Sequence, residues 1–232
     1  MDSRNALFVV FFFFMLVPLT QAQRIGAFVS AGAATSQIEG DELKGFKKWG
    51  FAGSVGAFAR LTENGRWHLS IEAGYARRGA YENSGDPKTP YHINLSLDYV
   101  DIPLTLFFKD PYGGIYIGLG PVYSRLVRQP HDEIAYNPDY FVPDVSDMSF
   151  LKNDFALAGE IRFPVWRGLM MSLRYQYSLI PVKKDWLFTE YLRANKSKAQ
   201  VNINNCYNSS VMIRLLWQFG TPDDGFSSKQ RL

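Results

Sequence analysis

The sequence has little cysteine, little excess charge and few long apolar runs, and each shortage excludes a class of protein. A single cysteine, Cys206, among 232 residues rules out a disulfide within the chain. Lys and Arg number 25 against 22 Asp and Glu, a net charge of +3, which is too small a basic excess to attract nucleic acid. After the N-terminal segment no run approaches the ~18 apolar residues of a transmembrane helix. We therefore expect no nucleic-acid partner and no membrane-spanning helix in the mature chain.

Aromatic residues and glycine are plentiful instead. The chain has 18 Phe, 13 Tyr, 5 Trp and 19 Gly, is 47% hydrophobic and has a mean hydropathy of −0.15. This content of apolar residues excludes a disordered chain. The modest hydropathy is compatible with a membrane β-barrel, because only one face of each of its strands is apolar.

The N-terminus has the pattern of a secretory signal peptide. Arg4 precedes an apolar run from Ala6 to Val17, and Thr20-Gln21-Ala22 follows as a small-residue cleavage site. The run is too short to cross ~30 Å of hydrocarbon as a helix. We interpret residues 1–22 as a cleaved signal peptide, 23–220 as one β-barrel domain and 221–232 as a polar tail. An uncleaved N-terminal anchor is the alternative.

Alternation of apolar and polar residues predicts eight strands, at 24–36, 49–61, 66–78, 91–109, 114–126, 152–163, 168–180 and 206–219. Most of these segments are about twice the ~5–6 residues usual in soluble proteins, and their length suits tilted membrane strands of ~9–11 residues.

The connections between these segments are short and long in turn. Short turns fall at 62–65, 110–113 and 164–167, whereas long links fall at 37–48, 79–90, 127–151 and 181–205. Outer-membrane barrels show this asymmetry, with the short turns in the periplasm. The sequence thus predicts an all-β fold: an eight-stranded antiparallel up-and-down transmembrane β-barrel with short periplasmic turns and long extracellular loops.

Aromatic residues gather near the predicted strand ends. One set lies beside the short turns: Trp67, Phe108, Tyr112, Phe163, Trp166, Trp217 and Phe219. A second set lies toward the long loops: Trp49, Phe51, Tyr81, Tyr91, Tyr123, Tyr177 and Tyr207. Two such sets are typical of girdles at the membrane interfaces, although ordinary core aromatics would also explain them.

The segment 91–109 contains an irregularity. Its apolar residues change from odd to even positions between Tyr99 and Ile102, and Pro103 follows, where a backbone donor is missing. A β-bulge between Tyr99 and Ile102 would accommodate both features.

Several short motifs occur in order over residues 25–125: Ser36-Gln37-Ile38, Gly40-Asp41, Gly45-Phe46, Lys48, Gly50-Phe51, Gly53, Glu72-Ala73-Gly74-Tyr75, Arg78-Gly79-Ala80, Leu97-Asp98-Tyr99-Val100-Asp101-Ile102-Pro103-Leu104 and Gly118-Leu119-Gly120-Pro121. In this order they resemble the PorT-like family of outer-membrane β-barrels in Bacteroidetes. The resemblance implies an eight-stranded outer-membrane barrel. It implies little about activity, since the family is named for a member linked to type IX protein secretion.

Charged residues occur on the strand faces opposite the apolar rows: Glu72, Glu160, Arg162, Arg174 and Arg214, with Arg60 and Asp98. The lumen of an eight-stranded barrel is just wide enough for side chains to fill, and charges placed there must pair. We predict that Glu72, Glu160, Arg174 and Arg214 form an internal polar network that plugs the lumen. A water-filled channel is the alternative.

The sequence offers little for catalysis. Its three histidines, His68, His92 and His131, lie near a turn, at a strand start and in a long loop. His92 could lie near Ser84 or Asp86 across the link 79–90, but nothing in the spacing demands it, and no cluster has metal-ligand spacing. We predict no catalytic residue, no cofactor and no metal.

The predicted function is that of a small non-enzymatic outer-membrane barrel with a structural or interaction role. Expected partners are membrane lipid and lipopolysaccharide, and envelope or secretion proteins that meet the loops 127–151 and 181–205. Two alternatives stay open: a lipid-modifying barrel enzyme, of the lipid A deacylase or acyltransferase type, and a soluble, secreted, lipocalin-like binder.

Overall fold

The computed structural model describes residues 25–39, 45–62, 64–83, 91–129, 133–136, 150–184, 186–192, 197–203 and 205–219. The expected signal peptide, the expected C-terminal tail and large parts of the two longest loops lie outside these residues. No helix in the described part of the chain is long and apolar enough to cross a membrane.

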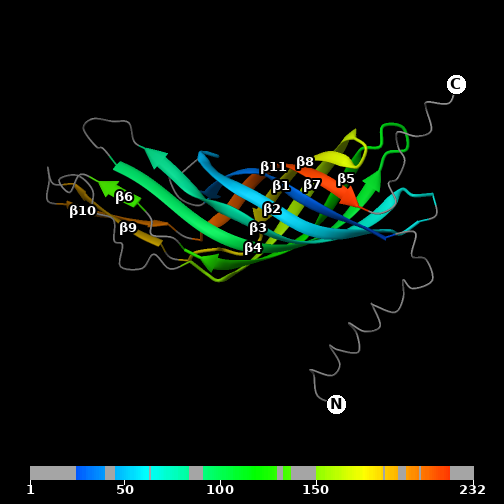
Figure 1. Cartoon of the computed structure of the whole chain (residues 1–232). Helices are drawn as coiled ribbons and strands as arrows, with labels where there is room; N and C mark the ends of the chain where they lie inside the picture. Colours follow the sequence, from blue (N-terminus) through cyan, green and yellow to red (C-terminus); the bar gives the residue numbers. More distant parts are fainter. Residues whose placement is uncertain are drawn as a thin grey trace, which may run out of the picture.

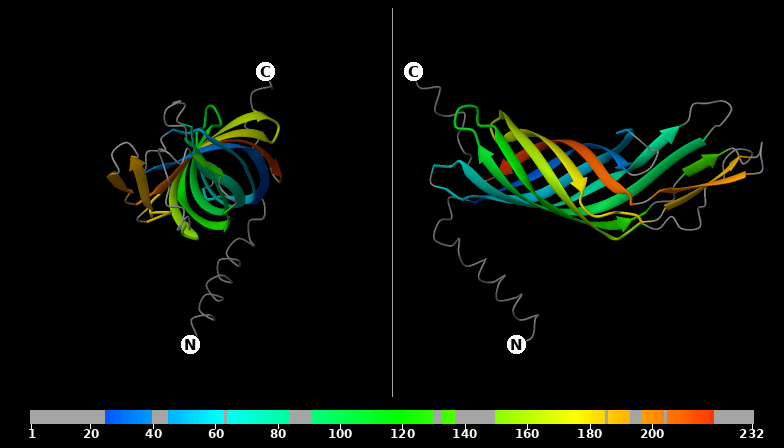
Figure 2. Two further views of the ribbon diagram at one scale, coloured as in Figure 1. Left: turned by 90° about the vertical axis from the view of Figure 1, so that its left-hand side faces the viewer. Right: turned by 180° about the vertical axis from the view of Figure 1, so that it is seen from behind.

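Eight long strands form a closed antiparallel barrel (Figure 1). They are β1 (Ile25–Glu39), β2 (Lys48–Arg60), β3 (Trp67–Asn83), β4 (Tyr91–Lys109), β5 (Tyr116–Arg128), β7 (Asn153–Trp166), β8 (Leu169–Ser178) and β11 (Tyr207–Phe219). Each pairs with its neighbours in the chain, and β1 closes the sheet by pairing with β11. The view along the barrel in Figure 2 shows the resulting ring. Closure leaves none of these strands as an open edge.

Three short turns join strands at one end of the barrel, here called the turn end, and the opposite end is called the loop end. Gly65 and Gly168 occupy two of these turns with φ of 66° and 78°, a left-handed conformation that favours glycine. The first residues of β1 and the last residues of β11 lie at the turn end (Figure 1).

The predicted eight-stranded barrel is confirmed, but some predicted loop boundaries are wrong. β1 continues to Glu39 and β3 to Asn83, so the barrel extends further toward the loop end than predicted. The predicted loops 127–151 and 181–205 also contain three strands: β6 (Glu133–Tyr136) extends the sheet beside β4, and β9 (Trp186–Leu192) pairs with β10 (Ser197–Ile203). These strands are short and lie outside the ring of eight barrel strands.

The bulge predicted between Tyr99 and Ile102 is wrong. Odd-numbered residues of β4 point inward on both sides of this segment, and Leu97, Tyr99 and Asp101 are all buried. Their apolar members fill the loop end of the lumen, which explains the apparent change of phase without any bulge in β4. The irregularity lies in the pairing of β4 with β5, where the register shifts between Asp98 and Tyr99 and leaves Val127 as the extra residue.

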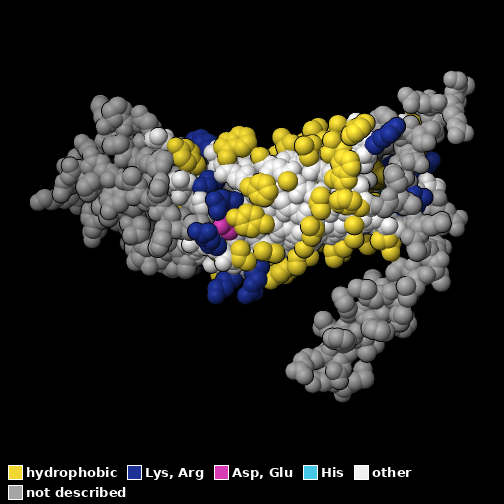
Figure 3. Space-filling model, in the orientation of Figure 1, with side chains coloured by type: hydrophobic (Ala, Val, Ile, Leu, Met, Phe, Trp, Pro, Cys, Tyr) yellow, Lys and Arg dark blue, Asp and Glu magenta, His cyan; other side chains and the backbone are white. Residues whose placement is uncertain are grey.

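The outer face of the barrel is an apolar band (Figure 3). Its exposed side chains include Val29, Val55, Ile71, Ile102, Leu104, Ile117, Leu119, Leu173, Ile213 and Leu215. Trp67, Trp166, Trp217 and Phe219 are exposed at the turn end, and Trp49 and Phe51 toward the loop end. Ten residues separate Trp67 from Arg77 along β3; at ~3.3 Å per residue and ~40° of tilt they span about 25 Å. That is the height of the apolar band of an outer-membrane barrel.

Labelling from outside the cell tests which end of the barrel faces outward. Lys184 is exposed at the loop end and Asn64 is exposed in a turn, so we expect a bulky impermeant maleimide to reach Lys184→Cys in intact cells. Asn64→Cys should react only after the outer membrane is opened. The wild-type protein supplies the unlabelled baseline because its one cysteine, Cys206, is buried. The reverse pattern would contradict this orientation.

Candidate functional site

The main candidate site is a cluster of charged side chains inside the barrel. Four strands supply the four predicted members: Glu72 from β3, Glu160 from β7, Arg174 from β8 and Arg214 from β11. All four are buried. Each occupies a position whose parity along its strand points inward, away from the exposed apolar row. The structure brings all four together.

The two glutamates share the arginines. Arg174 donates to Glu72 at 2.6 Å and, through Nε, to Glu160 at 2.7 Å. Arg214 donates to Glu72 at 2.9 Å and to Glu160 at 3.0 Å. Glu160 and Arg174 are direct cross-strand partners, whereas Glu72 reaches them across the lumen. Each arginine therefore links two strands that do not adjoin.

Arg162 is the third arginine of the cluster. It donates to both glutamates, Glu72 and Glu160, at 2.7 Å. Its guanidinium also lies over the rings of Phe28, 4.7 Å from the centroid, and Phe107, at 4.3 Å. Aromatic faces stabilise a desolvated cation, so the rings take the place of solvent on this side of the cluster.

Glycines make room for these bulky side chains. Gly56 lies opposite Glu72 and Gly118 lies opposite Glu160 in the neighbouring strands. A Cβ at Gly56 would overlap the ring of Phe28, and one at Gly118 would overlap the ring of Phe107. Part of the high glycine content therefore serves the packing of the lumen.

Serine hydroxyls complete the coordination of the carboxylates. Ser172 donates to Glu160 at 2.7 Å, and Ser54 donates to Glu72 at 3.0 Å. With these bonds the four carboxylate oxygens all accept from charged or hydroxyl donors. Paired in this way, the glutamates are structural anions rather than free bases.

A second ionic layer lies nearer the loop end. Arg78 forms an ion pair with Asp101 and lies 4.0 Å from Asp154, and all three residues are buried. Ser178 donates to Asp154 at 2.8 Å, and the guanidinium of Arg78 lies 5.1 Å from the centre of the Tyr99 ring. The layer thus contains two carboxylates and one guanidinium.

Sequence reasoning missed this second layer, although a signal was present. Arg78 has the same parity in β3 as Glu72, and Asp154 has the same parity in β7 as Glu160. Arg78 is the last residue of the predicted strand 66–78, so the sequence prediction does not assign it to the interior.

The sequence predicts that Asp98 and Arg60 lie with the interior charges. This prediction is wrong for Asp98. Its register partner is Arg77, whose side chain is 40% exposed on the outer face, and Asp98 accepts from it at 2.7 Å. Even positions of β4 point outward, which explains the correction. Arg60 lies at the turn end of β2, opposite the buried His68.

Apolar clusters lie on both sides of the ionic layers. The cluster at the turn end comprises Phe28, Phe107, Tyr116, Met170 and Leu216. The cluster at the loop end comprises Ile38, Ala80, Leu95, Leu97, Tyr99, Phe150, Val182 and Cys206. Along the axis the charged layers are therefore flanked by apolar clusters at both ends.

The structure places one of the three histidines fully. His68 is buried, with its ring edge-on to Tyr116 at a centroid distance of 5.1 Å. The side chain of His92 and all of His131 lie outside the described residues. Within the described ranges, no group of three or more His, Cys, Asp or Glu side chains is placed to hold a metal ion.

Comparison with known proteins agrees with this architecture. Residues 6–219 match the family model of the outer membrane protein beta-barrel domain. The comparison with curated proteins gives no match.

Several solved structures are similar in fold. The attachment invasion locus protein Ail of Yersinia pestis is 12% identical, covering 85% of this chain and 99% of its own, with a TM-score of 0.42. Neisserial surface protein A is 14% identical, covering 83% and 97%, with a TM-score of 0.44. The outer membrane protease OmpT from Escherichia coli is 11% identical, covering 86% and 98%, with a TM-score of 0.35.

Removing an interior arginine tests the energetic role of the ionic layers. Arg174→Ala leaves two buried carboxylates short of a partner, and Arg78→Ala leaves Asp101 and Asp154 without their cation. Breaking a buried pair in this way typically costs about 3–5 kcal/mol. We expect both variants to unfold at clearly lower urea concentration in detergent micelles. Arg167→Ala, at an exposed turn residue, is the matched control and should change the midpoint little. Equal losses in all three variants would contradict a special role for the interior pairs.

Proposed function

We propose, from the premise that this chain belongs to the outer membrane protein beta-barrel domain family, that it is a small closed barrel without enzymatic activity. Its role is structural or interactive, at the cell surface or in an envelope complex. The family match supports residence in the outer membrane. In this proposal the lumen serves stability, and the outer face and loops meet partners.

The observation that carries this proposal is the shared pairing of Glu72 and Glu160 with three arginines. An open channel would line its lumen with polar groups around water, whereas these charges contact one another and are buried. The apolar clusters on either side add further barriers to ions, because an ion would lose its hydration there.

We also propose a narrower family and a processing step. The ordered motifs of residues 25–125, among them Leu97–Leu104 and Gly118–Pro121, favour a PorT-like barrel of Bacteroidetes. The apolar run from Ala6 to Val17 favours export through a cleaved signal peptide ending at Ala22.

The loops 127–151 and 181–205 are the proposed contact regions for envelope or secretion proteins. Function in rigid scaffolds commonly lies in loops. The hairpin of β9 and β10 extends beyond the loop end of the barrel (Figure 1), where a partner could approach it.

Conductance measurements test the closed lumen. We expect the purified protein, inserted into planar bilayers and shown to be folded by its heat-dependent gel mobility, to pass no steady current. An open porin inserted in the same way provides the positive control. A steady conductance from the wild-type protein would mean that water and ions pass the ionic layers, and would overturn the closed-barrel proposal.

An activity assay tests the enzymatic alternative. We expect no release of fatty acid when the folded protein is incubated in detergent with phospholipid or with lipid A. The candidate base for such chemistry is His92, so His92→Ala is the diagnostic variant, with His131→Ala as its control. Turnover by the wild type that His92→Ala abolishes and His131→Ala spares would establish an enzyme instead.

A further inference from the structure

The outer face of the barrel changes character near the loop end of β3, β4 and β5. Below this level the outward side chains are apolar, whereas above it Arg125 and Arg128 are exposed and Arg77 is partly exposed. Figure 3 shows Lys and Arg side chains gathered between the apolar band and the undescribed part of the chain.

The strand register makes the three arginines neighbours. Arg77 on β3 pairs with Asp98 on β4, and Asp98 pairs with Arg128 on β5, so Arg77, Asp98 and Arg128 form one row. Tyr75, Val100 and Arg125 form the next row toward the turn end. Adjacent strands lie ~4.8 Å apart, so one small anion could contact side chains from more than one of these strands.

The charges of this cluster are unequal. Asp98 accepts two hydrogen bonds from Arg77, at 2.7 and 3.1 Å, and is itself 2% exposed. Arg125 donates to the neutral amide oxygen of Asn153 at 3.3 Å, which leaves its charge uncompensated by that bond. The described residues of the cluster thus include three guanidinium groups and one carboxylate. Asp98 orients Arg77, and the surplus charge is positive.

The cluster lies at the level expected for lipid headgroups. Arg77 is about 25 Å from Trp67 along the barrel axis, the height of the apolar band, and Trp67 is at the turn-end girdle. With the loop end outward, this level is the headgroup region of the outer leaflet.

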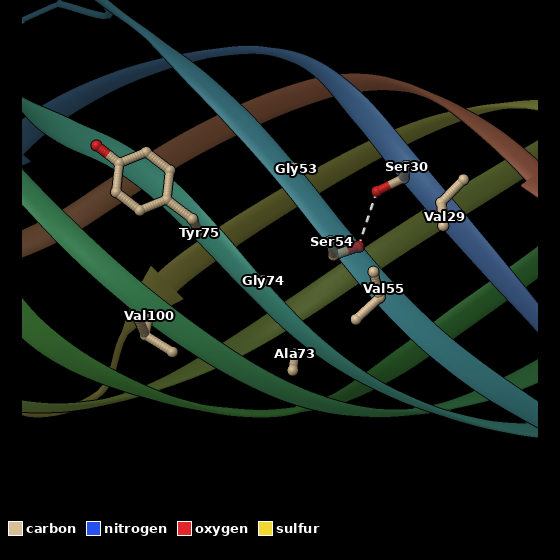
Figure 4. Close-up of a pocket in the computed structure, with 9 residues that line it drawn as sticks. All are labelled: Val29, Ser30, Gly53, Ser54, Val55, Ala73, Gly74, Tyr75 and Val100. Carbon is tan, nitrogen blue, oxygen red and sulfur yellow. Dashed lines mark hydrogen bonds between the residues drawn. The ribbon is translucent and has the colours of Figure 1, made fainter.

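A mainly apolar groove opens on the same outer face, across β1 to β4, next to the arginine cluster. Val29 and Val55 line one side and Tyr75 and Val100 the other, while Gly53, Ala73 and Gly74 lie between them (Figure 4). Ser30 and Ser54, hydrogen-bonded to each other at 2.7 Å, complete the lining. Its volume is about 520 Å³. Tyr75 and Val100 belong both to the groove and to the row that includes Arg125, so the two features are continuous.

We propose that this face binds one phosphate-bearing lipid of the outer leaflet, with an acyl chain in the groove and the phosphate on Arg77, Arg125 and Arg128. Guanidinium groups bind phosphate oxygens through paired, charge-assisted hydrogen bonds, and the apolar groove suits a hydrocarbon chain. The site rests on the proposed residence in the outer membrane, but not on the closed lumen. It assigns the lipid contact to the barrel wall, apart from the loops 127–151 and 181–205.

Native mass spectrometry of the full-length mature protein, released from neutral detergent, tests the headgroup contact. The probes are dipalmitoyl phosphatidic acid and dipalmitoyl glycerol, which differ only in the phosphate. The test variant is Arg125→Gln with Arg128→Gln; the matched control is Arg66→Gln with Arg167→Gln, two exposed arginines at the turn end. Each arginine near the headgroup strengthens binding of an anionic lipid by about five-fold. We therefore expect the preference for phosphatidic acid over dipalmitoyl glycerol to fall by roughly 25-fold in the test variant and to be unchanged in the control.

A second variant tests the acyl-chain contact independently of the phosphate contact. Ala73→Trp places a large ring in the groove and leaves all three arginines in place, so binding of phosphatidic acid should fall at least ten-fold. Excess inorganic phosphate should not displace the lipid from the wild type, because it cannot occupy the groove.

If the test and control variants lose the preference equally, net charge alone explains the effect and the proposed site is overturned. Displacement by inorganic phosphate, or undiminished binding by Ala73→Trp, would overturn the lipid as its occupant. Heat-dependent gel mobility checks that every variant is folded. If the protein conducts ions and still gives the expected lipid results, the closed lumen is contradicted and the lipid site is not.

Discussion

Two glutamates shared among three arginines are the interaction on which the rest of this barrel depends. Glu72 and Glu160 lie on strands that do not adjoin, and Arg162, Arg174 and Arg214 contact both of them. Neither charge type can be buried alone without a large desolvation cost, so the five side chains must be positioned together. Inward glycines, aromatic rings over Arg162 and serine donors all serve this requirement.

The arrangement reverses that of a soluble β-protein. Apolar side chains cover the outside, and the interior contains charged layers with apolar clusters on both sides of them. An eight-stranded lumen is narrow enough for these layers to fill it. Since the interior groups contact one another, the surfaces left for recognition are the outer face and the loop end.

The outer face is apolar over most of its height and becomes charged near the loop end. The pair of Arg77 and Asp98 marks the level at which lipid-facing residues change from apolar to charged, about one apolar-band height above Trp67. A paired charge at this position can lie at the headgroup interface without the cost of full burial in hydrocarbon. The same boundary joins the arginines to the groove lined by Tyr75 and Val100. The barrel wall therefore presents a polar rim above an apolar surface, the two environments that an amphiphile requires.

The period-two pattern of the sequence by itself determined the number of barrel strands, their antiparallel order, the outward rows and the inward position of Glu72, Glu160, Arg174 and Arg214. These properties are local, because each residue's face follows from its parity within one strand. Only the tertiary structure decided which inward residues share a level across the lumen, since that depends on the stagger of all eight strands at closure. It joined Arg78 to Asp101 and Asp154, turned Asp98 outward beside Arg77, and placed Leu97 and Tyr99 in an interior apolar cluster. The sequence pattern of β4 suggested a bulge there because an apolar inward row in a membrane barrel has the same pattern as an outward row displaced by one residue.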